Sequence, residues 1–144
     1  MTLNSEYVKW IPVTQSDATA NDNDKSFTVP AGKNWMLQGI HVSLVSSSDA
    51  GNRRVAVEIQ GVNSTVYQEV VVGAVQTASL TRRYDLNPGA VDATTFRSTL
   101  LTTPINPFIL DQSWKIRVYD LADISSSADD MTVRISALER SSTD

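Results

Sequence analysis

Alternation of apolar and polar residues with a period of two is the feature that most constrains how this chain can fold. It is clearest in three segments: RRVAVEIQGV at 53–62, SWKIRVYDL at 113–121 and MTVRISAL at 131–138. An extended strand points successive side chains to opposite faces, so each segment predicts a strand with one apolar face and one polar face. A sustained helical period with capping residues is absent from the sequence, so we expect an all-β protein.

Further strand candidates are separated by short stretches rich in Gly, Pro, Asn, Asp and Ser, which favour turns. They lie at residues 7–13, 25–30, 35–46, 64–73, 77–86, 96–103 and 107–111. Eight to ten strands at this spacing predict two packed antiparallel sheets, a β-sandwich of jelly-roll type. The predicted core includes Val57, Ile116, Val118 and Val133.

The segment SFTVPAGKNWMLQGIHVSLVS at 26–46 predicts a turn followed by a long strand. Pro30 and Gly32 suit the turn, because proline presets φ and glycine tolerates a positive φ. The inward row of the strand is predicted to be Met36, Ile40, Val42 and Leu44. Trp35 and Leu37 have the opposite parity, which requires either a β-bulge near Gln38-Gly39 or a second apolar surface.

The first 25 residues differ in composition from the body, which we place at 26–144. Residues 14–24, TQSDATANDND, are polar and predict a linker. The segment before it carries apolar side chains that an N-terminal arm could bury against a partner protein, and these candidate binding residues are Tyr7, Val8, Trp10, Ile11 and Val13. Residues 7–13 could equally be the first strand of the sandwich.

Charge and composition exclude several classes of partner. The formal net charge is −4 and the twelve Lys and Arg residues are scattered, whereas nucleic-acid binding needs a clustered excess of positive charge. The sequence MTLNSEYVKW lacks the pattern of a signal peptide, and no apolar run approaches the roughly 20 residues that span a bilayer. We therefore expect synthesis in the cytoplasm and neither nucleic acid nor membrane as a partner.

The sequence offers no recognisable set of catalytic or metal-binding residues. It has no cysteine, and its one histidine, His41, is predicted to be a half-buried strand residue. Glu58 and Glu69 fall on polar strand faces without the spacing of a carboxylate pair. The acidic groups NDND at 21–24 and ADD at 128–130 lack the spacing of a known calcium loop, so we interpret them as solvated loop charges. We expect neither enzymatic activity nor a cofactor.

Three parts of the chain carry a family resemblance: FTVPAGKNWMLQGIHVSLVSSSDAGNRRVAVEIQ, GAVQTASLTRRYDLNPGA and TTPINPFILDQSWKIRVYDLADISSSADDMTVRISALE. Over residues 26–139 the chain resembles small all-β virion proteins encoded in the head gene regions of tailed bacteriophages. The matching motifs consist of strands and turns and do not mark a site.

The resemblance implies a capsid decoration, or cement, protein that binds the outer surface of a phage head and stabilises the shell. Its expected partners are the major capsid protein and further copies of itself in a homotrimer, and its expected location is the virion. Two alternatives remain: a head–tail or tail joining protein, and a receptor- or carbohydrate-binding module of a virion.

Overall fold

The computed structural model describes residues 9–122, 124 and 128–142, and almost all of its elements are strands. The strands are β1 (Ile11–Asp17), β2 (Lys25–Thr28), β3 (Lys33–Val45), β4 (Val55–Gln60), β5 (Val66–Val71), β6 (Thr81–Asn87), β7 (Leu100–Pro104), β8 (Ile109–Leu110), β9 (Lys115–Asp120) and β10 (Asp130–Ser141). The short 3-10 helix η1 (Val62–Ser64) separates β4 from β5. The prediction of an all-β protein is confirmed. Within these ranges no helix is long and apolar enough to cross a membrane.

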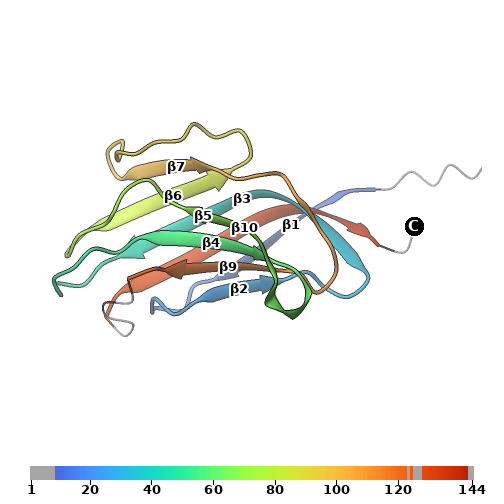
Figure 1. The fold of residues 1–144 in the computed structure, drawn as a ribbon, viewed down its shortest axis with the longest axis horizontal. Coiled ribbons are helices and arrows are strands. Elements are labelled where there is room, and N and C mark those ends of the chain that lie inside the picture. Colours follow the sequence, from blue (N-terminus) through green and yellow to red (C-terminus); the bar gives the residue numbers. More distant parts are fainter. Residues whose placement is uncertain (1–8, 123, 125–127, 143–144) are drawn as a thin grey trace, which may run out of the picture.

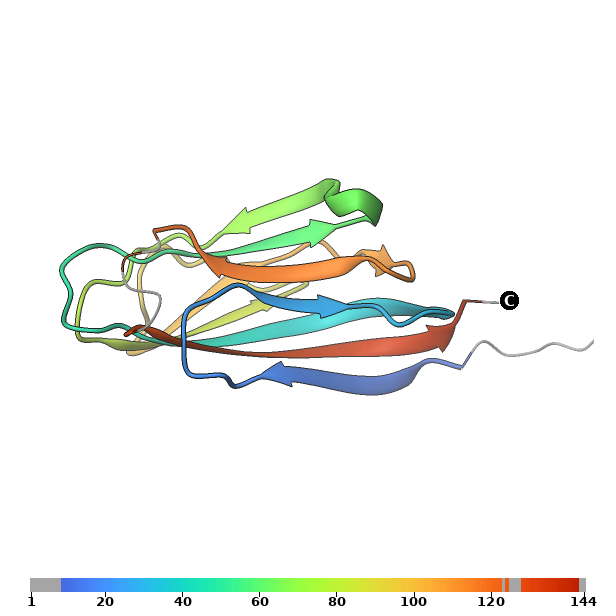
Figure 2. The same cartoon turned by 90° about the horizontal axis from the view of Figure 1, so that it is seen from below.

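The strands form two sheets that pack face to face (Figures 1 and 2). The larger sheet has the order β1-β10-β3-β6-β7, with β8 paired to β3, and the smaller has the order β2-β9-β4-β5. Strands from opposite ends of the chain lie side by side in each sheet, β1 beside β10 and β2 beside β9, as they do in a jelly roll. The predicted sandwich is confirmed, although β6 and β7 form a parallel pair among otherwise antiparallel described ladders.

The core lies between the inner faces of the two sheets. The predicted core residues Val57, Ile116, Val118 and Val133 are all buried there, none more than 1% exposed. Burying aliphatic side chains from both sheets removes apolar surface from water, and this is the main favourable contribution to folding. The outer faces of the sheets remain available for polar side chains.

Strand β3 contains a β-bulge at the position where its apolar parity changes. Ser136 of β10 pairs with Gly39 and the next residue, Ala137, pairs with Leu37, so Gln38 is an extra residue in β3. The bulge turns both Trp35 and Ile40 inward, each 1% exposed. Of the two explanations left open by the sequence, the bulge is correct. The prediction that Met36 faces inward is wrong, because its parity before the bulge is opposite to that of Trp35 and Leu37.

The linker is shorter than the predicted residues 14–24. The first four of these residues belong to β1, which pairs along its whole length with residues 133–139 of β10. Backbone hydrogen bonding to β10 is open to polar residues as well as apolar ones, so a polar sequence can still form an edge strand. Residues 18–24 then connect β1 in the larger sheet to β2 in the smaller sheet.

Candidate functional site

Strand β1 is an edge of the larger sheet and pairs with β10 on one side only (Figure 1). None of its seven residues is buried. On its other side, the backbone N–H and C=O groups have no ladder partner among the described strands. An open edge of this kind can accept a strand from another protein chain.

The structure places three of the five predicted binding residues at this edge. Trp10 precedes β1 and lies against Arg140, whose guanidinium carbon is 4.7 Å from the centre of the indole ring. Ile11 is 52% exposed, whereas Val13 is partly buried and packs against the core. Tyr7 and Val8 lie outside the described residues. The edge therefore offers Ile11 to solvent, while Val13 fastens the strand to the body.

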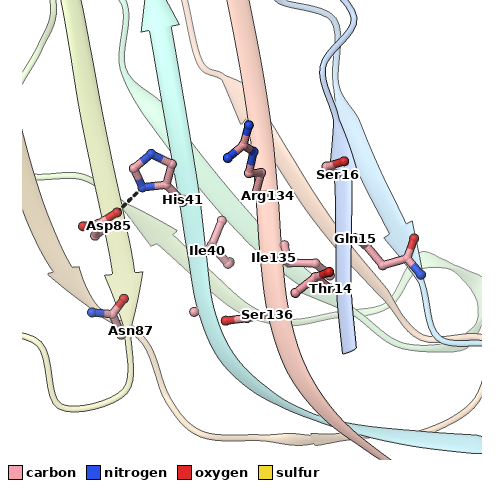
Figure 3. A pocket seen from close by; sticks show the side chains of 11 residues that line it. Thr14, Gln15, Ser16, Ile40, His41, Asp85, Asn87, Arg134, Ile135 and Ser136 are labelled. Atoms are coloured by element: carbon pink, nitrogen blue, oxygen red, sulfur yellow. Dashed lines mark hydrogen bonds and ion pairs between the residues drawn. The ribbon is translucent and has the colours of Figure 1, made fainter. Parts of the chain in front are cut away.

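A groove with a volume of about 690 Å³ crosses the outer face of the larger sheet beside β1 (Figure 3). Its lining comes from four neighbouring strands: Thr14, Gln15 and Ser16 of β1, Gly39, Ile40 and His41 of β3, Asp85 and Asn87 of β6, and Arg134, Ile135 and Ser136 of β10. Most of these side chains are polar. The groove is thus a polar depression that spans the sheet from its β1 edge.

Strand register aligns the polar side chains of the groove. Ser16 pairs with Arg134, Arg134 pairs with His41, and His41 pairs with Asp85, so these four residues form one row across four strands. Gly39 lies in the neighbouring row opposite Ser136. A Cβ atom at Gly39 would lie 3.4 Å from Asn87 Oδ1 and 3.5 Å from Ser136 Oγ, so glycine keeps the groove open there.

The polar groups of the groove suit the binding of a polar ligand. His41 Nδ1 contacts the Asp85 carboxylate, which orients the imidazole ring (Figure 3). Among the described residues, no hydroxyl group forms a hydrogen bond with His41 Nε2, and no carboxylate forms an ion pair with Arg134. The groove therefore presents a guanidinium, an imidazole paired with a carboxylate, two amides and hydroxyl groups, which can bind carboxylate, amide or hydroxyl groups of a partner.

Sequence reasoning did not find the groove. Arg134 lies on the polar face that the alternation in MTVRISAL predicts, and His41 is half-buried as predicted. Neither residue signals a site by itself, because the groove depends on the registers that join β1, β10, β3 and β6. The polar residues of β1 were interpreted as a linker, and this interpretation hid their contribution.

Glu58 and Glu69 face each other across β4 and β5 on the outer face of the smaller sheet. Tyr119 lies between them, and its hydroxyl is 3.2 Å from Glu58 Oε1 and 3.1 Å from Glu69 Oε1. Burial alone would raise the pKa of Glu58, but hydrogen bonds from Gln60, Arg117 and Tyr119 outweigh it and hold that pKa below its ordinary value. Burial and the two carboxylates raise the pKa of Tyr119.

The interpretation of the two acidic groups as solvated charges is wrong for Asp22 and Asp129. Their exposed fractions are 5% and 0%. Asp24 does face solvent, where it forms an ion pair with Arg117. Asp129 is buried against Arg53 and Ser47, and the N–H of Met131 holds the linker beside Asp22 by donating to the C=O of Asn21. Local composition reveals neither of these contacts between distant segments.

No protein-family model matches the chain, and neither does any curated protein. Among solved structures, the empty head of turnip yellow mosaic virus matches with a TM-score of 0.42 and 12% identity, covering 99% of this chain and 85% of that one. The VP2 protein of infectious bursal disease virus matches with a TM-score of 0.42 and 12% identity, but the 98% of this chain that aligns spans only 36% of VP2. Disulfide-linked pili of Bacillus endospores match with a TM-score of 0.27 and 11% identity, over 92% of this chain and 90% of that one. These values assign neither a family nor a function.

Proposed function

We propose that this chain is a structural virion protein that decorates the outer surface of a tailed-phage head and attaches to the major capsid protein through the β1 edge. The observation that carries the proposal is the open edge of β1, which has no buried residue and begins with an exposed Ile11. The sequence resemblance of residues 26–139 to phage head proteins supports the same role.

The edge suits attachment for two physical reasons. Adding a strand to an open ladder satisfies backbone groups with little demand on side-chain identity, and Ile11 supplies apolar area worth about 25 cal/mol for each Å² buried. In a homotrimer three such edges act together, so individually weak contacts give a large combined affinity. A protein that binds only the assembled shell stabilises that shell by mass action.

The test is co-sedimentation of the purified full chain with phage heads that lack it. We expect the chain to sediment with heads in hundreds of copies per particle, and Ile11→Asp to weaken binding at least tenfold because a charge replaces the apolar contact. Val91→Asp is the matched control: Val91 is 79% exposed in the loop between β6 and β7, at the opposite edge of the sheet. Equal binding by Ile11→Asp and the wild type would refute attachment through β1, and no binding by the wild type would refute decoration.

The groove supports a second candidate function, a receptor- or carbohydrate-binding module of the virion. Its guanidinium, amide and hydroxyl groups could bind a polar ligand such as a sugar, although none of its lining residues is the Trp, Tyr or Phe on which a sugar ring stacks. A glycan array distinguishes the two roles. A binding module should bind specific glycans, and Arg134→Ala should abolish that binding, whereas a decoration protein should bind no glycan. A joining protein would instead appear in only a few copies at the tail vertex in particle images.

A further inference from the structure

Three buried aspartates meet at the end of the sandwich where the β1–β2 linker, the β3–β4 loop and the β9–β10 loop come together. They are Asp22 of the linker, Asp120 at the end of β9 and Asp129 just before β10, and their exposed fractions are 5%, 8% and 0%. One carboxylate oxygen from each lies within 4.8 Å of the other two. The three residues are far apart in sequence, so the fold itself brings them together.

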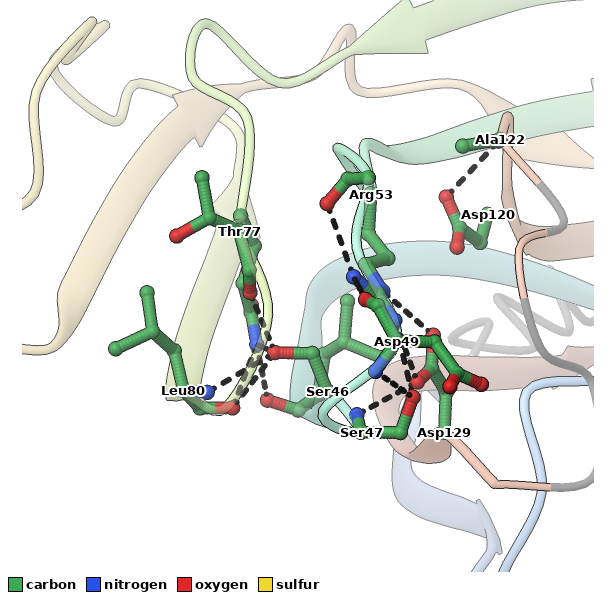
Figure 4. Close-up of polar contacts among 12 residues, drawn as sticks. Ser46, Ser47, Asp49, Arg53, Thr77, Leu80, Asp120, Ala122 and Asp129 are labelled. Atoms are coloured by element: carbon green, nitrogen blue, oxygen red, sulfur yellow. Dashed lines mark hydrogen bonds and ion pairs between the residues drawn. The ribbon is translucent and has the colours of Figure 1, made fainter.

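Asp129 is already neutralised by a buried arginine (Figure 4). Arg53 donates from Nε to Asp129 Oδ2 at 2.7 Å and from Nη2 to Oδ1 at 3.1 Å, while the backbone N–H of Ser47 donates to Oδ1 at 2.7 Å. Burial would raise the pKa of Asp129, but these hydrogen bonds lower it. A carboxylate has about four lone-pair sites, so Asp129 can still offer one to a further ligand.

Asp120 has an electrostatic interaction with Arg53 but no hydrogen bond from that guanidinium to match those of Asp129. Its Oδ1 accepts hydrogen bonds from the backbone N–H groups of Arg54, at 2.9 Å, and Ala122, at 3.1 Å, but its Oδ2 is buried with no hydrogen-bond partner. No ion pair joins Asp120 to a described cationic side chain. In Figure 4 the second oxygen is turned away from the contact with Ala122. A buried carboxylate oxygen without a partner is costly, so this atom indicates a missing positive ligand.

We propose that Asp22, Asp120 and Asp129 bind a calcium ion, with Asp120 Oδ2 as one of its ligands. Calcium–oxygen distances are about 2.3 to 2.6 Å, so two oxygens on opposite sides of one calcium ion are at most about 5 Å apart, and three oxygens that all lie within 4.8 Å of one another can share one ion. Magnesium holds its ligands at about 2.1 Å in a strict octahedron and gives up its water reluctantly, so a cluster of protein carboxylates suits the more adaptable calcium ion better. The all-oxygen donors disfavour zinc and copper, which prefer nitrogen and sulfur.

The bound ion would join the linker to the body. Asn21 of the linker already accepts a backbone hydrogen bond from Met131 of β10, with a distance of 2.8 Å, next to the cluster. A calcium ion shared by Asp22, Asp120 and Asp129 would add a further connection between the linker and the body. Calcium binding is therefore expected to stabilise the folded chain without being required for its core to form.

The test is isothermal titration of the full chain, first treated with EDTA and then dialysed, with calcium chloride. We expect about one calcium ion per chain and a rise of at least about 3 °C in melting temperature at saturation. Asp120→Asn should lower the affinity at least tenfold, because it removes the charge but keeps Oδ1 as an acceptor for the two backbone N–H groups. Asp92→Asn, which makes the same change at an exposed loop position, should bind as the wild type does.

Stability measured in EDTA separates metal binding from a purely structural role. Without calcium, Asp120→Asn should be at least as stable as the wild type, since it removes a buried negative charge whose Oδ2 has no hydrogen-bond partner. With calcium, only the wild type should gain stability. If Asp120→Asn fails to fold, Asp22→Asn is tested by the same criteria. The proposal is overturned by the absence of both heat and a melting shift at 10 mM calcium, by tighter binding of magnesium than of calcium, or by unchanged affinity in the folded variant.

Discussion

At the scale of single residues, Glu58 shows how one carboxylate makes stability depend on pH. Its pKa is lowered from the ordinary 4.5 in the folded state, where Gln60, Arg117 and Tyr119 donate hydrogen bonds to it and outweigh the effect of burial. A group with a lowered pKa contributes its stability above its unfolded pKa. That contribution is lost as the pH falls through the lower, folded value.

Replacing Glu58 by Gln is therefore expected to lower the free energy of unfolding by about 1 to 2 kcal/mol at pH 7, because charge-assisted hydrogen bonds become neutral ones. The difference between wild type and variant should shrink as the pH drops below 4.5. Urea unfolding followed by circular dichroism from pH 6 to pH 2.5 measures it, with the exposed Asp92→Asn as the control. A difference that is independent of pH would show that Glu58 contributes through packing rather than charge.

At the scale of elements, strand β3 marks how far local sequence could predict the fold. Apolar alternation correctly placed Ile40, Val42 and Leu44 in the core, and the reversed parity of Trp35 and Leu37 indicated a bulge. The side chain of Met36, before the bulge, was wrongly predicted to face inward, because the pairing register decides which residues of a strand face the core. Periodicity thus predicts that a strand exists and which face is apolar, whereas register depends on the partner strand.

Deletion of Gln38 tests the role of the bulge. Without the extra residue, either Trp35 and Leu37 or the row from Ile40 onward would turn to the outer face, so we expect a loss of at least about 4 kcal/mol or failure to fold. Deletion of Thr95, an exposed residue in the β6–β7 loop, should cost much less and serves as the control. Thermal melts of both deletions make the comparison. Equal losses would mean that the sheet can absorb the register change and that the bulge does not fix the parity of β3.

At the scale of the whole molecule, the sites depend on contacts between segments that are distant in sequence. The groove needs four registered strands, and the aspartate cluster joins Asp22 to residues about a hundred positions later. Single-sequence patterns describe each segment separately, so they predicted the jelly-roll class but missed both assemblies. The same limit applies to β1, whose polar residues indicate a linker until β10 is known to lie beside them.

Removing residues 1–17 tests what β1 does for the whole molecule. Val13 is the β1 residue that packs against the core, so we expect the shortened chain to remain folded with a lower melting temperature. The deletion would expose β10, a strand of 12 residues, as a new open edge, and long unprotected edges promote association between chains. Sedimentation velocity should therefore show association that increases with concentration, and a peptide of residues 9–17 added in trans should suppress it by pairing with β10. A folded chain that does not associate would mean that β10 is protected without β1, and an unfolded chain would mean that β1 is indispensable to the sandwich.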